Sequence, residues 1–172
     1  MFKGLDQYWF PYVATQILSL FFLIAAIWNT RMARLLLAAL FLYAAIFNMQ
    51  LSIRNPDKYL EYAPMALPFY RRFIEGWFSH YNYIVVPLIA VGQLIISLGF
   101  LLKGWWVKWA CIGAIVFLLA IAPLMVGAGF PFSIVVSIAA TIVLKKDKRD
   151  YLWRRSVARQ LKQKDEGFIS PN

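Results

Sequence analysis

Residues 109–144 read WACIGAIVFLLAIAPLMVGAGFPFSIVVSIAATIVL, a run of 36 residues without one charged side chain. A helix of about 20 apolar residues crosses a hydrocarbon core of about 30 Å. One helix over the whole run would extend about 54 Å, nearly twice that thickness. Pro123 and the segment GAGFP at residues 127–131 are helix breakers within the run. We therefore predict two crossings, residues 109–126 and a short one at residues 132–144.

The composition of the whole chain indicates a location in lipid. Of its 172 residues 62% are hydrophobic and 15% are charged, and its mean hydropathy is +0.62. A soluble domain carries about 25% charged residues, and a chain this short cannot bury so much apolar surface in one core. The sequence therefore predicts an integral membrane protein with several crossings.

Three more apolar segments precede the long run, at about residues 9–28, 35–53 and 84–102. Arg31 and Arg34 follow the first of them, whereas Lys3 on its amino side is offset by Asp6. Basic residues favour the cytoplasmic side and no small-residue cleavage site follows, so we predict a first span rather than a signal peptide. The predicted fold is all-α, a bundle of five transmembrane spans with the N-terminus outside and the C-terminus inside. A four-span bundle with both termini inside distributes the charges about as well, but it must treat residues 109–144 as one crossing.

The segment of residues 55–83 is too charged to be a span. Its charged residues are Asp57, Lys58, Glu61, Arg71, Arg72 and Glu75. It is also rich in aromatic residues, and Pro64 and Pro68 are expected to divide it into short helices. Aromatic and charged side chains together are typical of the headgroup region, so we predict an external segment that lies at the membrane surface.

Residues 145–172 form a basic tail after the bundle of residues 1–144. This tail holds nine of the eighteen lysines and arginines of a chain with net charge +10. Apolar residues recur every four positions in this tail, at Trp153, Val157 and Leu161. This spacing predicts an amphipathic helix that lies on anionic lipids at the inner membrane surface. A helix exposed to solvent explains the same spacing equally well. Residues 167–172 are expected to be disordered. Because the positive-inside rule accounts for this charge and no nucleic-acid motif occurs, the sequence argues against nucleic-acid binding.

Polar residues within the predicted spans are candidates for binding or for packing. They are Thr15, Gln16, Ser19, Asn48, Gln50, Gln93 and Ser97. Gln93 and Asn48 are candidate ligand-binding residues, although hydrogen bonding between helices is favoured for Gln93. No acid, base or histidine lies deep in a predicted span, which argues against a proton relay or an ion-coupled transporter.

Small residues predict helix-packing faces. Gly129, Ser133, Ser137 and Thr141 follow one another at intervals of four, which places them on one face of the last span. Gly92 and Gly99 share a face of the third span in the same way. We interpret both faces as contact surfaces, within the bundle or toward a partner subunit.

His80 is the only histidine, and with Glu75 and Tyr81 it is the candidate for catalysis in the external segment. A histidine beside a carboxylate and a tyrosine could bind a quinone headgroup or transfer a proton. Hydrogen bonding of His80 to headgroups or to loop backbone is the favoured interpretation. Arg71 and Arg72 could bind an anionic lipid or substrate, or pair with Glu75 one turn on.

Other sites with known chemistry are not expected. One cysteine, Cys111, and one histidine are too few for a zinc site of nitrogen and sulfur ligands, so no metal is predicted. Cys111 alone does not indicate a redox compartment. No Gly-rich phosphate loop, Ser-His-Asp set or CxxC motif occurs.

Two motifs carry a resemblance, Gly92-Gln93-Leu94 and the sequence LGFLLKG at residues 98–104. With the aromatic external segment before them and two spans after them, residues 35–144 resemble the DoxX-like superfamily of small bacterial membrane proteins. The resemblance implies a four-span core, to which the first span and the basic tail are additions. It also implies a link to quinol oxidases or thiol-stress complexes. Family members more often carry an acidic residue at the position of Gln93, so this chain departs from the pattern at its central polar residue.

These observations predict a non-catalytic accessory or structural subunit of a bacterial inner-membrane complex, with a respiratory complex as one candidate. The expected partners are the lipid bilayer and a membrane protein or a second copy of the chain, and no cofactor is required. One alternative is a DoxX-like redox protein that is either thiol-linked or quinone-binding, the latter with His80, Tyr81 and Gln93 lining a pocket. A second alternative is a carrier of a small neutral or lipidic molecule through the bundle.

Overall fold

The computed structural model describes residues 5–124, 129–148 and 152, with side chains described from residue 13 onward. Every element in these residues is helical. The five longest helices are α1 (Leu5–Trp28), α2 (Thr30–Arg54), α4 (Ser79–Leu101), α5 (Trp105–Ile121) and α6 (Phe132–Lys146). The part of the tail after residue 148, with its predicted amphipathic helix and disordered end, lies outside the described residues apart from Leu152.

Within the uncharged run of residues 109–144, the described residues belong to two long helices, α5 and α6. Helix α5 ends at Ile121 and continues into a short 3₁₀ turn, η3 (Ala122–Leu124), which contains Pro123. Helix α6 begins directly after Pro131. Its 15 residues extend about 22 Å, less than the thickness of a hydrocarbon core.

Three helical stretches are long and apolar enough to cross a membrane, and they span Thr30–Arg54, Pro68–Leu101 and Trp105–Leu124. The described apolar part of α1, Val13–Trp28, is shorter. Large apolar side chains on the outer surface, such as Trp28 at 85% exposed and Ile53 at 75%, fit a surface in contact with lipid. The chain thus has the construction of a helical membrane protein.

The predicted external segment consists of three short helices, which we call the cap (residues 56–78). They are a 3₁₀ helix, η1 (Pro56–Met65), then α3 (Pro68–Phe73) and a π-helical turn, η2 (Ile74–Phe78). Pro68 begins α3, as expected, and Pro56 begins η1. Pro64 is expected to divide the segment as well, but it lies inside η1, and the division falls between Met65 and Pro68. The cap runs through η2 directly into α4, so α4 begins five residues before the predicted third span.

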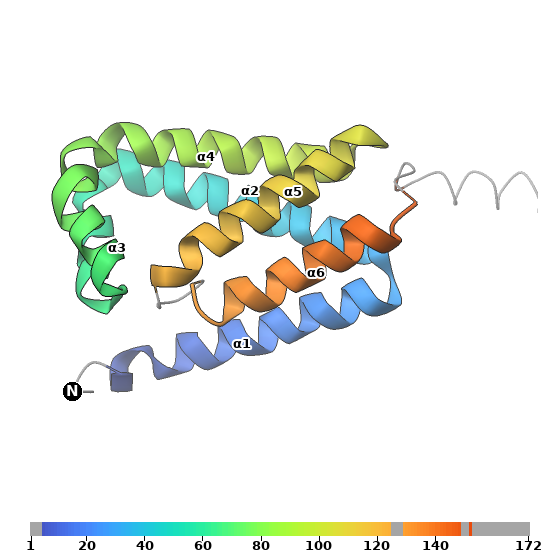
Figure 1. Cartoon of the computed structure of the whole chain (residues 1–172), viewed down its shortest axis with the longest axis horizontal. Helices are drawn as coiled ribbons and strands as arrows, with labels where there is room; N and C mark the ends of the chain where they lie inside the picture. The colour runs from blue at the N-terminus through green and yellow to red at the C-terminus, as the bar shows by residue number, and fades with distance from the viewer. Residues whose placement is uncertain (1–4, 125–128, 149–151, 153–172) are drawn as a thin grey trace, which may run out of the picture.

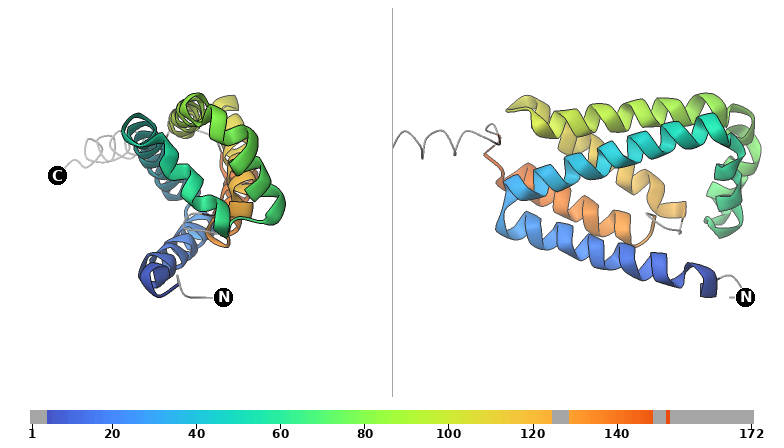
Figure 2. Two further views of the ribbon diagram at one scale, coloured as in Figure 1. Left: turned by 90° about the vertical axis from the view of Figure 1, so that its left-hand side faces the viewer. Right: turned by 180° about the vertical axis from the view of Figure 1, so that it is seen from behind.

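Helices α2 and α4 lie side by side and antiparallel, with α5 crossing beside them and α6 packed between α5 and α1 (Figure 1). Helices α1 and α2 diverge from their connecting turn at Asn29, so the bundle is narrow at this end and wider toward the cap (Figure 2). The cap closes onto the end of α5, where the Leu67 N–H and the Tyr70 hydroxyl donate to the carbonyls of Pro123 and Ala120. These bonds satisfy carbonyls that a helix end leaves free.

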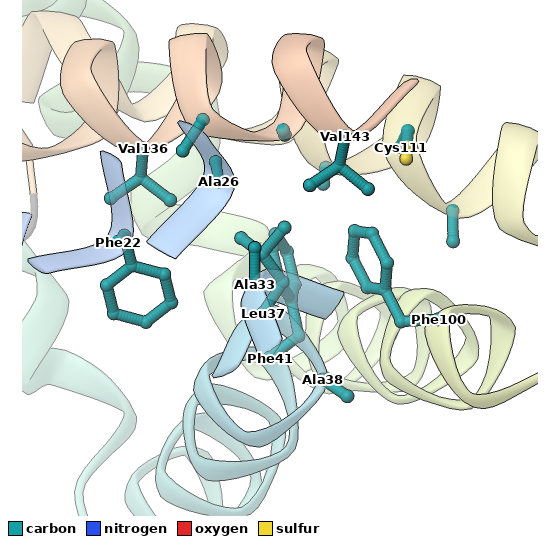
Figure 3. Packing of buried hydrophobic residues seen from close by; sticks show 14 of the residues in the cluster. Phe22, Ala26, Ala33, Leu37, Ala38, Phe41, Phe100, Cys111, Val136 and Val143 are labelled. Atoms are coloured by element: carbon teal, nitrogen blue, oxygen red, sulfur yellow. The ribbon is translucent and has the colours of Figure 1, made fainter. Parts of the chain in front are cut away.

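The main core lies at the narrow end and joins all five long helices (Figure 3). Many of its residues are alanines, including Ala26, Ala33 and Ala38, whose small side chains allow helix backbones to approach closely. Phe41 and Phe100 fill the remaining space between α2 and α4. A smaller cluster joins the cap to α4 and includes Ile74 and Val86.

Candidate functional site

A polar cluster joins α2, α4 and the cap. The Asn48 amide donates to Gln93 Oε1 at 2.8 Å, and the Tyr59 hydroxyl donates to Asn48 Oδ1 at 3.0 Å. Gln93 is 2% exposed, and Asn48 is partly buried. The structure thus brings the two candidate ligand-binding residues of the spans together and uses them to bond two helices to each other and to η1. An amide pair of this kind stabilises helix association in lipid by about 1–2 kcal/mol.

Replacing Gln93 with leucine is expected to lower the free energy of unfolding by about 1–2 kcal/mol, because the Asn48 amide loses its acceptor inside the protein. Tryptophan fluorescence during denaturant unfolding in mixed micelles measures this change. Replacing the exposed Gln50 with leucine is the matched control and should have little effect. If both variants unfold alike, the Asn48–Gln93 bond contributes no net stability.

Tyr59 extends this cluster out of the spans and into the cap. Burial, with a smaller contribution from Tyr62, raises the pKa of Tyr59 to about 12 from an ordinary value of 10.0. The folded protein therefore holds this phenolic proton more tightly than the unfolded chain. The stability that Tyr59 contributes is complete below pH 10 and is lost as the pH rises toward 12.

A Tyr59→Phe variant tests this directly. The difference between the phenolate absorbance titrations of wild type and variant isolates Tyr59 from the other eight tyrosines. We expect the difference to appear as a step with its midpoint near pH 12. A midpoint at the ordinary pKa of 10.0 would show that Tyr59 is solvated in the folded protein.

His80 lies in the first turn of α4 and is exposed. Its Nδ1 lies 3.0 Å from the carbonyl oxygen of Gly76 and 3.2 Å from the Ser79 hydroxyl. Tyr81 packs against Trp77, with 5.2 Å between ring centroids. Gln93 is thirteen residues farther along the same helix, about 20 Å away. The structure therefore does not bring His80 and Gln93 together in one pocket.

The charged residues of the cap pair locally. Arg71 Nε donates to Glu75 Oε1 at 2.7 Å, and both side chains are about half exposed. Glu75 is therefore bonded to Arg71 and has no bond to His80. Arg72 is exposed on the same short helix. Within the described residues, no group of three His, Cys, Asp or Glu side chains is placed to bind a metal ion.

The two predicted packing faces differ in their contacts. A Cβ at Gly99 would lie 2.9 Å from Ala110 Cβ, so this glycine allows α4 and α5 to touch, whereas a Cβ at Gly92 would meet nothing within 4 Å. On α6, Ser133 is fully buried and Ser137 nearly so, within the contacts to α1 and α5. Ser137 and Thr141 donate to backbone carbonyls of their own helix, whereas the Ser133 hydroxyl has no partner among the described residues. Gly129 is buried just before α6 and accepts a bond from the Ser133 N–H.

A buried ion pair, which sequence reasoning missed, lies at the narrow end of the bundle. Arg34 is 0% exposed, and its Nη1 lies 3.0 Å from Oδ1 of Asp147, which is also buried. The other carboxylate oxygen of Asp147 accepts a bond from the Thr30 hydroxyl at 2.8 Å. The pair therefore joins the start of α2 to the end of α6.

The same guanidinium also closes the end of α4. Its Nε and Nη2 donate to the carbonyl of Phe100 at 3.1 and 2.9 Å, and Nη2 donates to that of Leu102 at 2.6 Å. The last carbonyls of a helix are unsatisfied and carry partial negative charge, so a cation is favoured there. One arginine thus joins three helices. The sequence held one indication of this pair, since Asp147 is the one acid in the basic run KKDKR at residues 145–149. A run of charged residues, however, normally indicates a segment exposed to solvent.

The hydrogen bonds of these polar clusters connect parts of the protein to one another. Asn48, Gln93, Arg34 and Asp147 bond to other side chains or to backbone carbonyls of this protein, and the exposed His80 bonds to the turn before its helix.

No family model, curated protein or solved structure matches this chain.

Proposed function

We propose that this protein is a non-catalytic structural or accessory subunit of a bacterial inner-membrane complex, with a respiratory complex as one candidate. The observation that supports this most is the Arg34 cluster, in which a fully buried cation is bonded to one carboxylate and two backbone carbonyls. A group that is bonded on all sides in this way holds helices together and is not open to a substrate. The Asn48–Gln93 pair supports the same proposal.

In this proposal the chain crosses the membrane five times, with its N-terminus outside and its basic tail inside. The lengths and hydropathy of α2, α4 and α5 support three of these crossings. Helices α1 and α6 would supply the other two, and α6 would need a thinned membrane or partner contacts, because its 15 residues are short. Exposed lysines Lys145 and Lys146 at its end support an inner location for that end.

The test is purification of the tagged, full-length protein from the membranes of its own host in a mild detergent. We expect a membrane protein partner to co-purify in a fixed ratio. Recovery of a single copy with lipid alone would contradict the proposal. A matched preparation of an unrelated tagged membrane protein from the same host separates a true partner from abundant contaminants.

The DoxX-like redox function is the alternative, and the exposed aromatic residues next to His80 are the observation that favours it. Phe73 stacks on Trp77 at 5.6 Å, and Trp77 packs on Tyr81 at 5.2 Å, which forms an aromatic row outside the bundle. Such a row could receive a planar quinone ring. If replacing His80 with alanine and Gln93 with leucine leaves quinol turnover by host membranes unchanged, this alternative fails. Transport of a small neutral molecule is a further alternative, which uptake by reconstituted vesicles would test.

A further inference from the structure

An apolar groove of about 260 Å³ lies between α2 and α4 on the outer surface of the bundle. Its apolar lining consists of three residues of each helix: Ala45, Ile46 and Met49 from α2, and Ala90, Val91 and Leu94 from α4. The two alanines are buried and form the floor, whereas Ile46 and Val91 are about half exposed and form the walls. Because both helices are long and apolar enough to cross a membrane, hydrocarbon is the expected surroundings of this groove.

A cation lies in line with the groove at the end of α2. Gln50 also lines the groove, and Arg54 follows it by four residues on the same helix face, about 6 Å farther along. Arg54 is exposed and has no ion-pair partner among the described residues. The nearby acids of the cap are already bonded, since Asp57 accepts from Asn82 and Glu61 pairs with Lys58.

We propose that this groove binds one acyl chain of an anionic phospholipid, with the phosphate bound by Arg54. An arginine binds phosphate with two parallel hydrogen bonds, and the apolar walls suit a hydrocarbon chain. The groove is open on one side, so a hydrocarbon chain can lie along it without being enclosed.

The test uses the full-length protein in nanodiscs made of equal parts phosphatidylglycerol and phosphatidylcholine. Native mass spectrometry measures which lipid stays bound after the protein is released from the nanodisc. We expect one retained phospholipid, with phosphatidylglycerol favoured about fivefold, as one basic residue near a membrane surface provides. Arg54→Gln should remove the preference for phosphatidylglycerol and keep some lipid bound. Val91→Trp should fill the groove and abolish retention.

Two matched controls make this test specific. Arg72→Gln removes another exposed arginine in the cap, and Ile95→Trp adds the same bulk at an exposed residue of α4 that does not line the groove. Both controls should behave as wild type. Any one of four results would overturn the proposal. Wild type could retain the two lipids equally, or Arg54→Gln could keep the preference for phosphatidylglycerol. Val91→Trp could still retain lipid, or protein from host membranes could retain a quinone in place of phospholipid.

Discussion

Replacing Arg34 with methionine is expected to lower the free energy of unfolding by about 3–5 kcal/mol. The variant leaves the buried Asp147 carboxylate and the carbonyls of Phe100 and Leu102 without the cation that bonds them. An uncompensated buried charge is among the most destabilising defects in a protein. The measurement is equilibrium unfolding in mixed micelles, followed by tryptophan fluorescence.

The double variant Arg34→Met, Asp147→Leu distinguishes the ion pair from a general loss of packing. With both charges removed, most of the lost stability should return, because apolar replacements of a buried pair are often neutral. The control is Arg71→Met, which breaks the exposed pair with Glu75 and should cost less than about 1 kcal/mol. If Arg34→Met cost no more than Arg71→Met, the cluster would not be a structural centre of the bundle.

Replacing Gly99 with alanine is expected to destabilise the protein by about 1–3 kcal/mol. The new Cβ would lie 2.9 Å from Ala110 Cβ and 3.3 Å from the backbone oxygen of Trp106, so α4 and α5 must move apart. This cost opposes the gain of up to about 1 kcal/mol that alanine normally gives over glycine within a helix. Unfolding in the same micelles measures the net change.

Gly92 provides the matched control on the same helix. A Cβ there meets nothing within 4 Å, so Gly92→Ala should be neutral or stabilising. Adding Ala110→Gly to the Gly99→Ala variant removes the closest contact and should restore part of the stability. Equal effects of alanine at Gly92 and Gly99 would contradict a close contact between α4 and α5 at this position.

The helices could be predicted from the sequence because their length and hydropathy are local properties. The uncharged run of residues 109–144 is too long for one helix, and its proline and glycines show where it divides. The first residue of α4 could not be predicted from hydropathy. Residues 79–83 are polar and aromatic, yet they continue the helix, because Asn82 donates to the backbone carbonyl of Pro56 in the cap and the helix need not end where its hydropathy falls.

The polar clusters were only partly predictable, because they depend on which distant residues meet. Asn48 and Gln93 stand out as amides within apolar segments, but the bond between them follows from the alignment of α2 with α4. Arg34 and Asp147 are 113 residues apart, and each stands beside other charges that suggest solvent. Only the packing of α2, α4 and α6 at the narrow end removes this pair from the solvent.

We propose that this protein serves an assembly as a structural subunit. Native mass spectrometry of the protein released directly from host membranes, with surrounding lipid retained, tests it most directly. The proposal predicts a mass that contains this chain and a membrane protein partner in one fixed stoichiometry, which is retained when His80 is replaced with alanine. A mass equal to one chain with lipid alone would contradict it.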